Sequence, residues 1–249
     1  DWLKDYAIKA NVKGFVVGVS GGVDSGVVST LCAMTGLEIL LLEMPIRQKK
    51  DQVNRAWEHI EDLQKRFDNV KAMSVNLTPA FEELYKTFDV NDADFPHEKL
   101  AFANTRARLR MLTLYYYGQI NGLLVCGTGN KVEDFGIGFY TKYGDGGVDL
   151  SPIADLYKTE VYELSKALNL VKSIQNAIPT DGLWDAERTD EQQIGATYAE
   201  LEKIQKEWGT KSENDYEGRD LEVFQIFSRM NKAAQHKINP IPVCDIPEE

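Results

Sequence analysis

Residues 14–29 read GFVVGVSGGVDSGVVS, and this stretch decides the fold of the chain. The apolar, β-branched run at 14–19 predicts a buried strand. Ser20-Gly21-Gly22 breaks the strand, the two glycines let the backbone approach a ligand, and Asp24 and Ser25 are residues that cap helices. A loop that presents N–H donors at a helix N-terminus suits phosphate, although a plain Gly-Gly turn between strand and helix would look the same.

The loop matches neither of the two commoner phosphate-binding sequences. A Walker loop has Lys-Ser or Lys-Thr after its last glycine, where this chain has Val23-Asp24. A dinucleotide fingerprint needs G-x-G-x-x-G, which Gly18, Gly21 and Gly22 do not provide. If the loop binds phosphate, it does so as a site of another type, and on these residues alone a plain Gly-Gly turn stays equally open.

Strands and helices alternate along the first half of the chain. The expected strands cover 14–19, 38–44, 70–77 and 123–127, and the expected helices cover 1–13, 24–35, 50–67, 78–88, 99–120, 158–169, 190–208 and 220–237. This alternation predicts an α/β fold, a doubly wound and mostly parallel Rossmann-like sheet that binds ligands at the carboxyl ends of its strands. We expect one domain over 1–249, with the sheet core at 14–150 and a helical part at 151–249. Residues 90–97 and 127–150 are expected to be loops.

Composition narrows the class of protein. The net charge of −11 disfavours a nucleic-acid surface, since phosphate backbones are met by clustered Lys and Arg. Three cysteines, Cys32, Cys126 and Cys244, are too few and too scattered for a disulfide framework or a zinc site, and the first two are expected in the core. No apolar run could cross a bilayer and no signal-peptide pattern is present, so a cytoplasmic location is expected.

A second polar loop follows the last expected strand. Thr128 offers a hydroxyl there, and Glu133 a carboxylate that could share Mg²⁺ with Asp24. Nucleotide-bound Mg²⁺ takes one or two protein carboxylates and completes its shell with water and phosphate oxygens. Taken alone, Glu133 would more simply be an exposed loop acid.

Two sets of motifs resemble known families. SGGVDS at 20–25 resembles the pyrophosphate loop of the N-type ATP pyrophosphatases, which adenylate a substrate oxygen and let a nucleophile displace AMP. FYTKYGDGGVDLSPIADLYKTEVYEL at 139–164 resembles the signature of the ammonia-dependent bacterial NAD synthetases. The resemblance continues in NTRARLRM at 104–111, GTGNKVE at 127–133, IPTDGLW at 178–184, RTDEQQIGATY at 188–198 and QHKIN at 235–239.

The resemblance implies a function and a set of site residues. Members of that family use ATP to convert deamido-NAD (nicotinic acid adenine dinucleotide) to NAD, and they are homodimers whose dinucleotide site lies close to the interface. The implied ATP-binding residues are Gly18, Val19, Ser20, Gly21, Gly22, Val23, Asp24, Ser25, Thr128, Lys158 and Thr180, with magnesium on Asp24 and Glu133. The implied dinucleotide-binding residues are Tyr6, Asn104, Arg108, Leu124, Lys142, Asp145, His236 and Lys237.

The chemistry fits three of these as catalytic residues: Asp24, Asp145 and Lys158. Adenylation builds negative charge on departing pyrophosphate, which N–H donors, Mg²⁺ and Lys158 would stabilise. The second step needs ammonia at the acyl carbon, and Asp145 is expected to bind ammonium and help to remove its proton. Arg106, Arg108 and Arg110 alternate along one helix and cannot all face one site.

The chain departs from the family pattern near the second strand. Glu43 stands where many members have an arginine that is used on ATP, and Arg47 is expected to replace it. Lys49 stands where a glutamine is common, and Gln193 where some relatives have Glu.

Other functions remain open at this point. Another ATP pyrophosphatase, such as a tRNA-thiolating enzyme or a GMP synthetase core, would share the loop, and a non-catalytic nucleotide-binding module would keep the fold. A thiolating enzyme needs a reactive cysteine and a basic surface, and a binding module would be expected to lose Asp24, Glu133 or Lys158. The match leaves no room for a glutaminase domain of roughly 100–200 residues, so the nitrogen donor is expected to be free ammonia or ammonia from a separate partner.

Overall fold

The computed structural model describes residues 1–48, 50–88, 97–180 and 189–246. The four strands in this part are β1 (Gly14–Gly18), β2 (Glu38–Glu43), β3 (Val70–Ser74) and β4 (Leu123–Val125). The helices are α1 (Trp2–Lys9), α2 (Val23–Ala33), α3 (Lys50–Arg66), α4 (Thr78–Phe88), α5 (Glu98–Asn121), α6 (Lys158–Ala167), α7 (Lys172–Gln175), α8 (Asp190–Ile194), α9 (Tyr198–Glu207), α10 (Gly218–Ile238), the π-helix η1 (Lys131–Ile137) and the 3₁₀ turn η2 (Glu213–Asp215).

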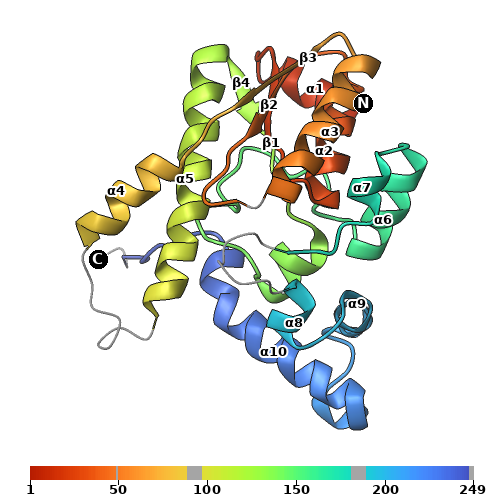
Figure 1. Cartoon of the computed structure of the whole chain (residues 1–249). Coiled ribbons are helices and arrows are strands. Elements are labelled where there is room, and N and C mark those ends of the chain that lie inside the picture. Colours follow the sequence, from red (N-terminus) through yellow and green to blue (C-terminus); the bar gives the residue numbers. More distant parts are fainter. Residues whose placement is uncertain (49, 89–96, 181–188, 247–249) are drawn as a thin grey trace.

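The strands form a parallel sheet in the order β3-β2-β1-β4. Phe15 pairs with Ile39 on one side and with Leu124 on the other, so β1 is central and all its backbone groups can be bonded. Figure 1 shows α5 on one side of the sheet and α2 and α3 on the other, with α8, α9 and α10 forming the lower part of the molecule in that view. This is the doubly wound arrangement that the alternation of elements predicts.

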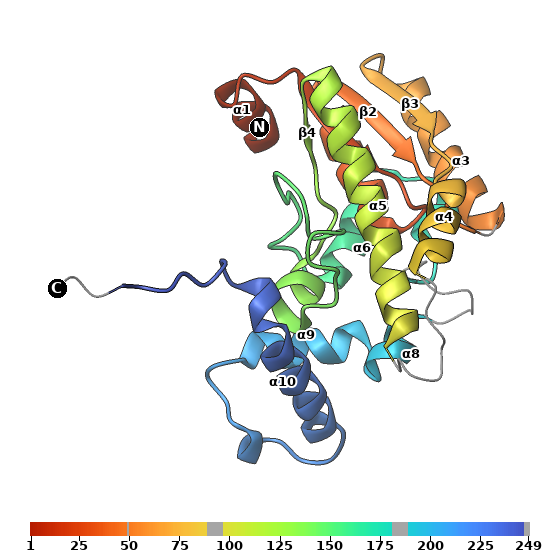
Figure 2. The ribbon, with the colours of Figure 1, turned by 90° about the vertical axis from the view of Figure 1, so that its left-hand side faces the viewer.

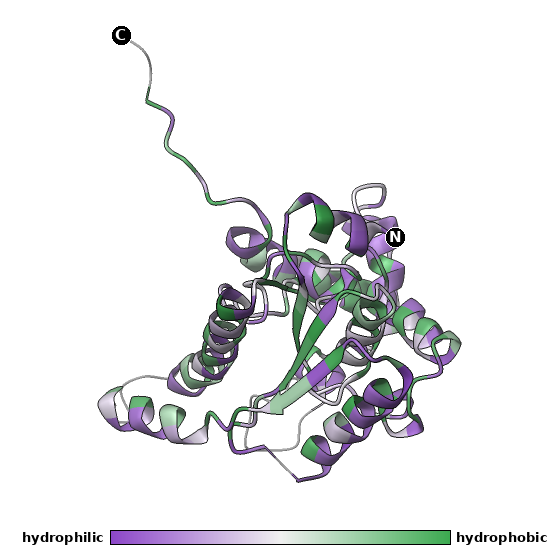
Figure 3. Ribbon diagram, turned by 90° about the horizontal axis from the view of Figure 1, so that it is seen from above, coloured by the Kyte–Doolittle hydropathy of each residue, from purple (hydrophilic) through white to green (hydrophobic). Residues whose placement is uncertain are grey.

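Alternate residues of the strands feed two different cores. Phe15, Val17 and Leu41 face α2 and α3, whereas Val16 and Leu42 face α4 and α5, and all five side chains are fully buried. Burying each of these side chains stabilises the fold by about 1.5–3 kcal/mol. Seen from above, the strands are mostly apolar, with a few polar positions, and the surrounding helices carry many polar residues (Figure 3).

The C-terminal helices have a core of their own. Leu201, Ile204 and Phe227 from α9 and α10 pack on Val132 and Ile137 of η1. The π-helix therefore joins the sheet to the helical part of the chain. After α10, residues 239–246 run away from the body of the molecule (Figure 2).

The structure confirms the four expected strands and the parallel α/β fold, and most helix bounds agree within a few residues. The single helix expected over 190–208 is wrong: Gly195 takes a left-handed conformation (φ 87°), which ends α8, and α9 begins again after the Thr197 cap. The region 127–150 is also not purely a loop, because it contains η1. Residues 90–96, Lys49 and the segment 181–188 of two motifs lie outside the described residues.

None of the described helices combines the length and the apolar character that a membrane span requires.

Candidate functional site

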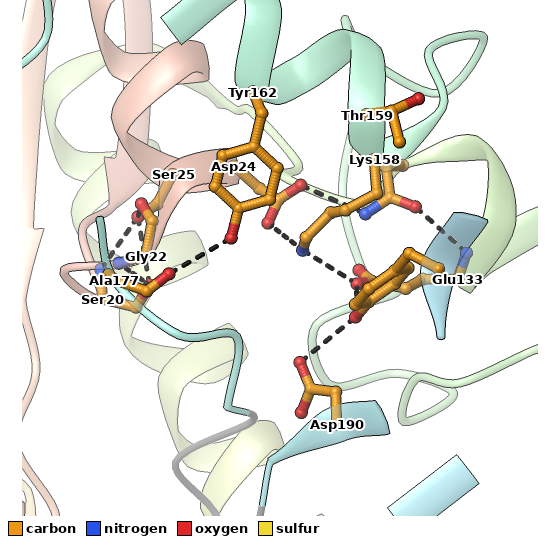
Figure 4. Close-up of polar contacts among 12 residues, drawn as sticks. Ser20, Gly22, Asp24, Ser25, Glu133, Lys158, Thr159, Tyr162, Ala177 and Asp190 are labelled. Carbon is orange, nitrogen blue, oxygen red and sulfur yellow. Dashed lines mark hydrogen bonds and ion pairs between the residues drawn. The ribbon is translucent and has the colours of Figure 1, made fainter. Parts of the chain in front are cut away.

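The segment 19–22 between β1 and α2, called the phosphate loop below, has a fixed backbone conformation. Gly21 has a φ of 83°, and the space beside its Cα is closed by the carbonyl oxygen of Gln52, which an added Cβ would approach to 2.9 Å. A side chain at this position would be strained for both reasons. Ser20 and Ser25 hydroxyls lie 3.0 Å apart and brace the loop from within (Figure 4).

The expected capping of α2 by Asp24 and Ser25 is wrong. The N-cap residue is Gly22, and no side chain caps the helix. Ser25 instead donates to the carbonyl oxygen of Gly22 at 3.0 Å, and Asp24 turns toward another part of the site. The helix N-terminus therefore keeps backbone donors and a positive dipole end for a ligand.

A buried ion-pair triad stands beside this loop. Lys158, at the first position of α6, places its Nζ 2.6 Å from Oδ2 of Asp24 and 3.0 Å from Oε1 of Glu133 (Figure 4). The three residues come from three separate elements, and the Lys158 side chain is only 4% exposed. Two carboxylates around one ammonium leave a net negative charge that a cation can balance.

Neighbouring side chains fix the two carboxylates of the triad. Asn130 donates from Nδ2 to Oδ1 of Asp24 at 3.1 Å, and its Oδ1 caps η1 by accepting from the N–H of Glu133 at 3.1 Å. The Tyr198 hydroxyl donates to Oε1 of Glu133 and also lies 3.2 Å from Oδ2 of Asp190. The start of η1 is therefore set by the same residue that orients Asp24.

The electrostatics of the triad follow from burial and pairing. Burial opposes the charge on Lys158, but Asp24 and Glu133 outweigh it and raise the Lys158 pKa, so the side chain stays an ammonium. Burial likewise opposes ionisation of Glu133, yet Lys158 and the Tyr198 hydroxyl lower the Glu133 pKa. For Asp24, burial dominates and raises the pKa.

A cavity of about 280 Å³ opens onto the loop and the triad. Every residue from Gly18 to Ser25 lines it, as do Thr128, Glu133, Asp145, Lys158 and Thr180. The expected ATP-binding, metal-binding and catalytic residues are thus brought together around one space. Thr180 accepts a weak contact from Gln52 Nε2 at 3.4 Å, which ties this wall to α3.

Two further carboxylates face this cavity. Asp145 accepts from the backbone N–H of Thr141 at 3.0 Å, and burial raises its pKa. Asp134 also lines the cavity, and its pKa is raised well above the usual value by burial and by the nearby charges of Glu133, Asp145 and Asp24. The sequence predicts Asp145 as a site residue but not Asp134, since no motif distinguishes an acid one residue after Glu133.

Most of the expected dinucleotide-binding residues gather around the segment 138–145, outside the lining of the cavity. Arg108 donates to the carbonyl oxygen of Lys142 at 3.3 Å, and Lys142 in turn donates to that of His236. Lys237 donates to the carbonyl oxygens of Gly138 and Tyr140, the latter at 2.8 Å. Asn104 bonds the hydroxyl of Thr141 at 2.6 Å. These side chains fix the loop that carries Asp145.

The other two expected dinucleotide residues lie apart from that group. Tyr6 is on α1 and packs against Trp2, and Leu124 lies within β4 and packs into the core. Within one chain the described structure does not bring these two residues to Arg108 or His236.

The three arginines of α5 diverge, as their spacing predicts. Arg106 is buried with its guanidinium over the ring of Phe81 at 4.8 Å, Arg108 reaches the 138–145 segment, and Arg110 lines the cavity. Arg110 donates to the carbonyl oxygen of Met44 and to Oε1 of Gln48, at 3.1 and 2.9 Å.

Arg47, the expected substitute for the arginine missing at position 43, faces α4. Its guanidinium forms a two-pronged ion pair with Glu82, at 2.6 and 2.8 Å, and it does not line the cavity. Glu43 is buried and accepts a hydrogen bond from Ser74 at 2.6 Å. An ATP contact by Arg47 stays a prediction, and Arg110 and Arg55 are the arginines on the cavity wall.

The donor set fits a nucleotide-bound magnesium ion. Asp24 and Glu133 supply hard oxygen ligands on the same side of the phosphate loop, which is the number of carboxylates that such an ion takes from protein. No group of three or more potential ligands that could hold a metal without phosphate exists within the described residues.

Comparison with known proteins agrees with this geometry. A profile of the NAD synthase family matches residues 1–241. The NH(3)-dependent NAD(+) synthetase of Carboxydothermus hydrogenoformans is 38% identical over 238 residues, 95% of this chain and 91% of that protein. The one from Finegoldia magna is 40% identical over 202 residues, covering 81% and 79%.

A solved structure of NMN synthetase from Francisella tularensis is 30% identical, covers 98% of this chain and 94% of its own, and superposes with a TM-score of 0.84. Sequence motifs, sheet topology and site geometry agree with these similarities. The chain belongs to the NAD synthase family.

Proposed function

We propose that this chain amidates deamido-NAD with ammonia to form NAD, using ATP and releasing AMP and pyrophosphate. The single observation that carries the proposal is the Asp24–Lys158–Glu133 triad beside an uncapped phosphate loop, in one cavity with Asp145. The relatives of this chain with that activity span nearly its whole length. The rival ATP pyrophosphatases and a non-catalytic module are not favoured by these similarities.

In the first step, the substrate carboxylate attacks the α-phosphorus of ATP and pyrophosphate leaves. The N–H groups of the phosphate loop and the ammonium of Lys158 would stabilise the charge that collects on the leaving group. Since phosphoryl-type transfer leaves little covalent work for the protein, holding the two reactants in line supplies much of the rest. Asp24 and Glu133 would hold Mg²⁺, which on binding neutralises phosphate charge and fixes the triphosphate geometry.

In the second step, ammonia attacks the acyl carbon of the adenylate and AMP leaves. Ammonium is the abundant form at neutral pH, so the site has to bind the cation and remove a proton. Asp145 lies at the cavity on a loop fixed by Arg108, Lys142 and Lys237, where its carboxylate would do both.

The similarity to NMN synthetase raises a second candidate function. The same chemistry on a nicotinic acid mononucleotide would need the same triad and loop and would leave the adenosine half of the dinucleotide site unused. The two functions differ in the substrate and not in the catalytic residues.

We further propose a cytoplasmic homodimer. The outer face of α5 exposes Leu112, Tyr116 and Ile120 at four-residue spacing, with Tyr116 61% exposed, and α1 exposes Trp2 and Tyr6. Apolar stripes of this kind mark interaction surfaces. We propose that in such a dimer Tyr6 of one chain lies near the dinucleotide site of the other.

The test is an assay with ATP, Mg²⁺ and ammonium chloride, with either deamido-NAD or nicotinic acid mononucleotide as acceptor. Parallel reactions replace ammonium with glutamine. We expect AMP and NAD from deamido-NAD and ammonium. A kcat/KM that is higher for the mononucleotide would replace the proposed substrate with the second candidate, and amidation of neither would overturn both.

A further inference from the structure

Arg55 lies on α3 where this helix touches the phosphate loop, and its side chain lines the cavity. An added Cβ on Gly21 would lie 3.4 Å from the Cβ of Arg55 and 3.3 Å from the backbone nitrogen of Ala56. The turn of α3 that carries Arg55 is therefore in van der Waals contact with the loop that faces the phosphates. No motif singled out this residue.

The guanidinium of Arg55 is only partly satisfied. Its Nε is buried and has no hydrogen-bond partner among the described residues. Arg55 forms an ion pair from Nη1 to Oδ2 of Asp51 at 3.4 Å, and the Asp51 side chain is 69% exposed. A buried N–H without an acceptor is unfavourable, so this position lacks an acceptor that a bound anion would supply.

The cavity wall carries more negative than positive side chains, so the positive charge of Arg55 matters for binding an anion there. Among the described residues the wall carries the carboxylates Asp24, Glu43, Glu133, Asp134, Asp145 and Asp190 against the cations Arg55, Arg110 and Lys158. Lys158 is held between two carboxylates, and Arg110 donates to Met44 and Gln48. A triphosphate entering this cavity needs positive charge beyond Lys158, and Glu43 does not provide it.

We propose that Arg55 binds the pyrophosphate part of ATP, and the pyrophosphate that is released. On binding, the guanidinium would turn toward the phosphate so that its Nε–H and an Nη–H donate to phosphate oxygens in a forked contact, and the loose Asp51 pair would be exchanged for the phosphate. Arg55 thereby supplies from α3 the positive charge that is absent at position 43. This inference rests on the proposed use of ATP and names a further residue for it.

The test compares Arg55→Gln with Arg66→Gln, which removes the same group from the far end of the same helix, where Arg66 pairs with Asp62. Isothermal titration calorimetry measures binding of magnesium pyrophosphate and of α,β-methylene-ATP to the intact protein, and steady-state assays give KM for ATP and for deamido-NAD. We expect Arg55→Gln to weaken both ligands and raise KM for ATP about ten- to a hundredfold. KM for deamido-NAD and all values of Arg66→Gln should stay within twofold of wild type.

Pyrophosphate and ATP-analogue affinities equal to wild type in Arg55→Gln would overturn the role of Arg55. Circular dichroism and thermal melting check that the variant folds. If it does not, Arg55→Lys is used, which keeps the charge but loses the fork and should bind about three- to tenfold more weakly; wild-type affinity in that variant would also overturn the role. A wild-type protein that forms no NAD while Arg55→Gln still loses pyrophosphate binding would refute the proposed function and leave the Arg55 role standing.

Discussion

Lys158 is the residue on which the site depends most. Replacing it by Met leaves Asp24 and Glu133 buried without their cation and removes a charge from the departing pyrophosphate. We expect kcat to fall about 10²–10³-fold and the free energy of unfolding to fall by about 3–5 kcal/mol. Steady-state rates and urea unfolding measure the two effects. Lys166→Met, on the exposed side of the same helix, is the control, and a Lys158 variant as active as this control would contradict the assignment.

Replacing Asp145 is expected to slow the second chemical step, amidation, and to leave the first, adenylation, unchanged. Asp145→Asn keeps the shape of the loop but removes the carboxylate that faces the cavity. Pyrophosphate release by the first turnover should continue at a rate close to wild type, while NAD formation falls about 10²-fold and more ammonium is required. Rapid-quench measurement of both products tests this. Equal slowing of the two products would mean that Asp145 acts before amidation.

His59 makes stability depend on pH. It is fully buried with Nε2 2.8 Å from the hydroxyl of Ser29, and burial lowers its pKa to about 4. In the unfolded chain the imidazole takes up its proton near pH 6.5, so between pH 6.5 and 4 the unfolded state binds more protons and stability falls as pH falls. This shift corresponds to about 3 kcal/mol.

Urea unfolding of wild type and of His59→Gln at pH 7 and pH 4 measures this contribution. The variant should lose about 3 kcal/mol less than wild type between the two pH values, because glutamine does not titrate. Equal losses in the two proteins would show that His59 is not the responsible group.

At the scale of elements, the close packing of α2 is the most restrictive contact. An added Cβ on Gly26 would come within 2.8 Å of Leu170, in the α6–α7 connection, and 3.0 Å of Ile174, in α7. Although alanine favours helices, Gly26→Ala should destabilise the protein by about 1–3 kcal/mol through overpacking. Adding Leu170→Ala should recover part of the loss, measured as a non-additive double-mutant cycle in thermal melts. Additive effects would contradict the clash.

The sequence predicts elements better than it predicts their junctions. The strands are recognisable because each is a short apolar run that ends at glycine or proline, as at Pro45. The break at Gly195 has a local signal, a glycine followed by the Thr197–Glu200 capping box, which the helical periodicity over 190–208 masks. The π-helix η1 could not be predicted, since its first residues are set by Asn130, which bonds Asp24, a residue 106 positions away. The motifs find Lys158, Glu133 and Asp24 as site residues, and one of them contains Asp190 and Tyr198 without indicating that Tyr198 bonds Glu133. Arg55 lies in no motif and reaches the cavity through the packing of α3.

At the scale of the whole molecule, the proposed dimer follows from the exposed face of α5. Tyr116→Lys places a charge at the centre of that face, where one chain would meet another. Light scattering after size exclusion should give a dimer for wild type and a monomer for the variant, with the fold unchanged. Glu163→Lys, at an exposed position of α6, is the control. A wild-type monomer would contradict the proposal.

The central place of β1 in the sheet also determines when during synthesis each of its two sides can be paired. Gly14 of β1 pairs with Glu38 of β2, which follows 24 residues later in the chain. On its other side Gly14 pairs with Leu123 of β4, which is made much later. During synthesis the first three strands can associate while the outer side of β1 still exposes unpaired N–H and C=O groups. Release of a chain that ends before Leu123 would thus leave β1 as an exposed edge strand, which is open to pairing with other chains.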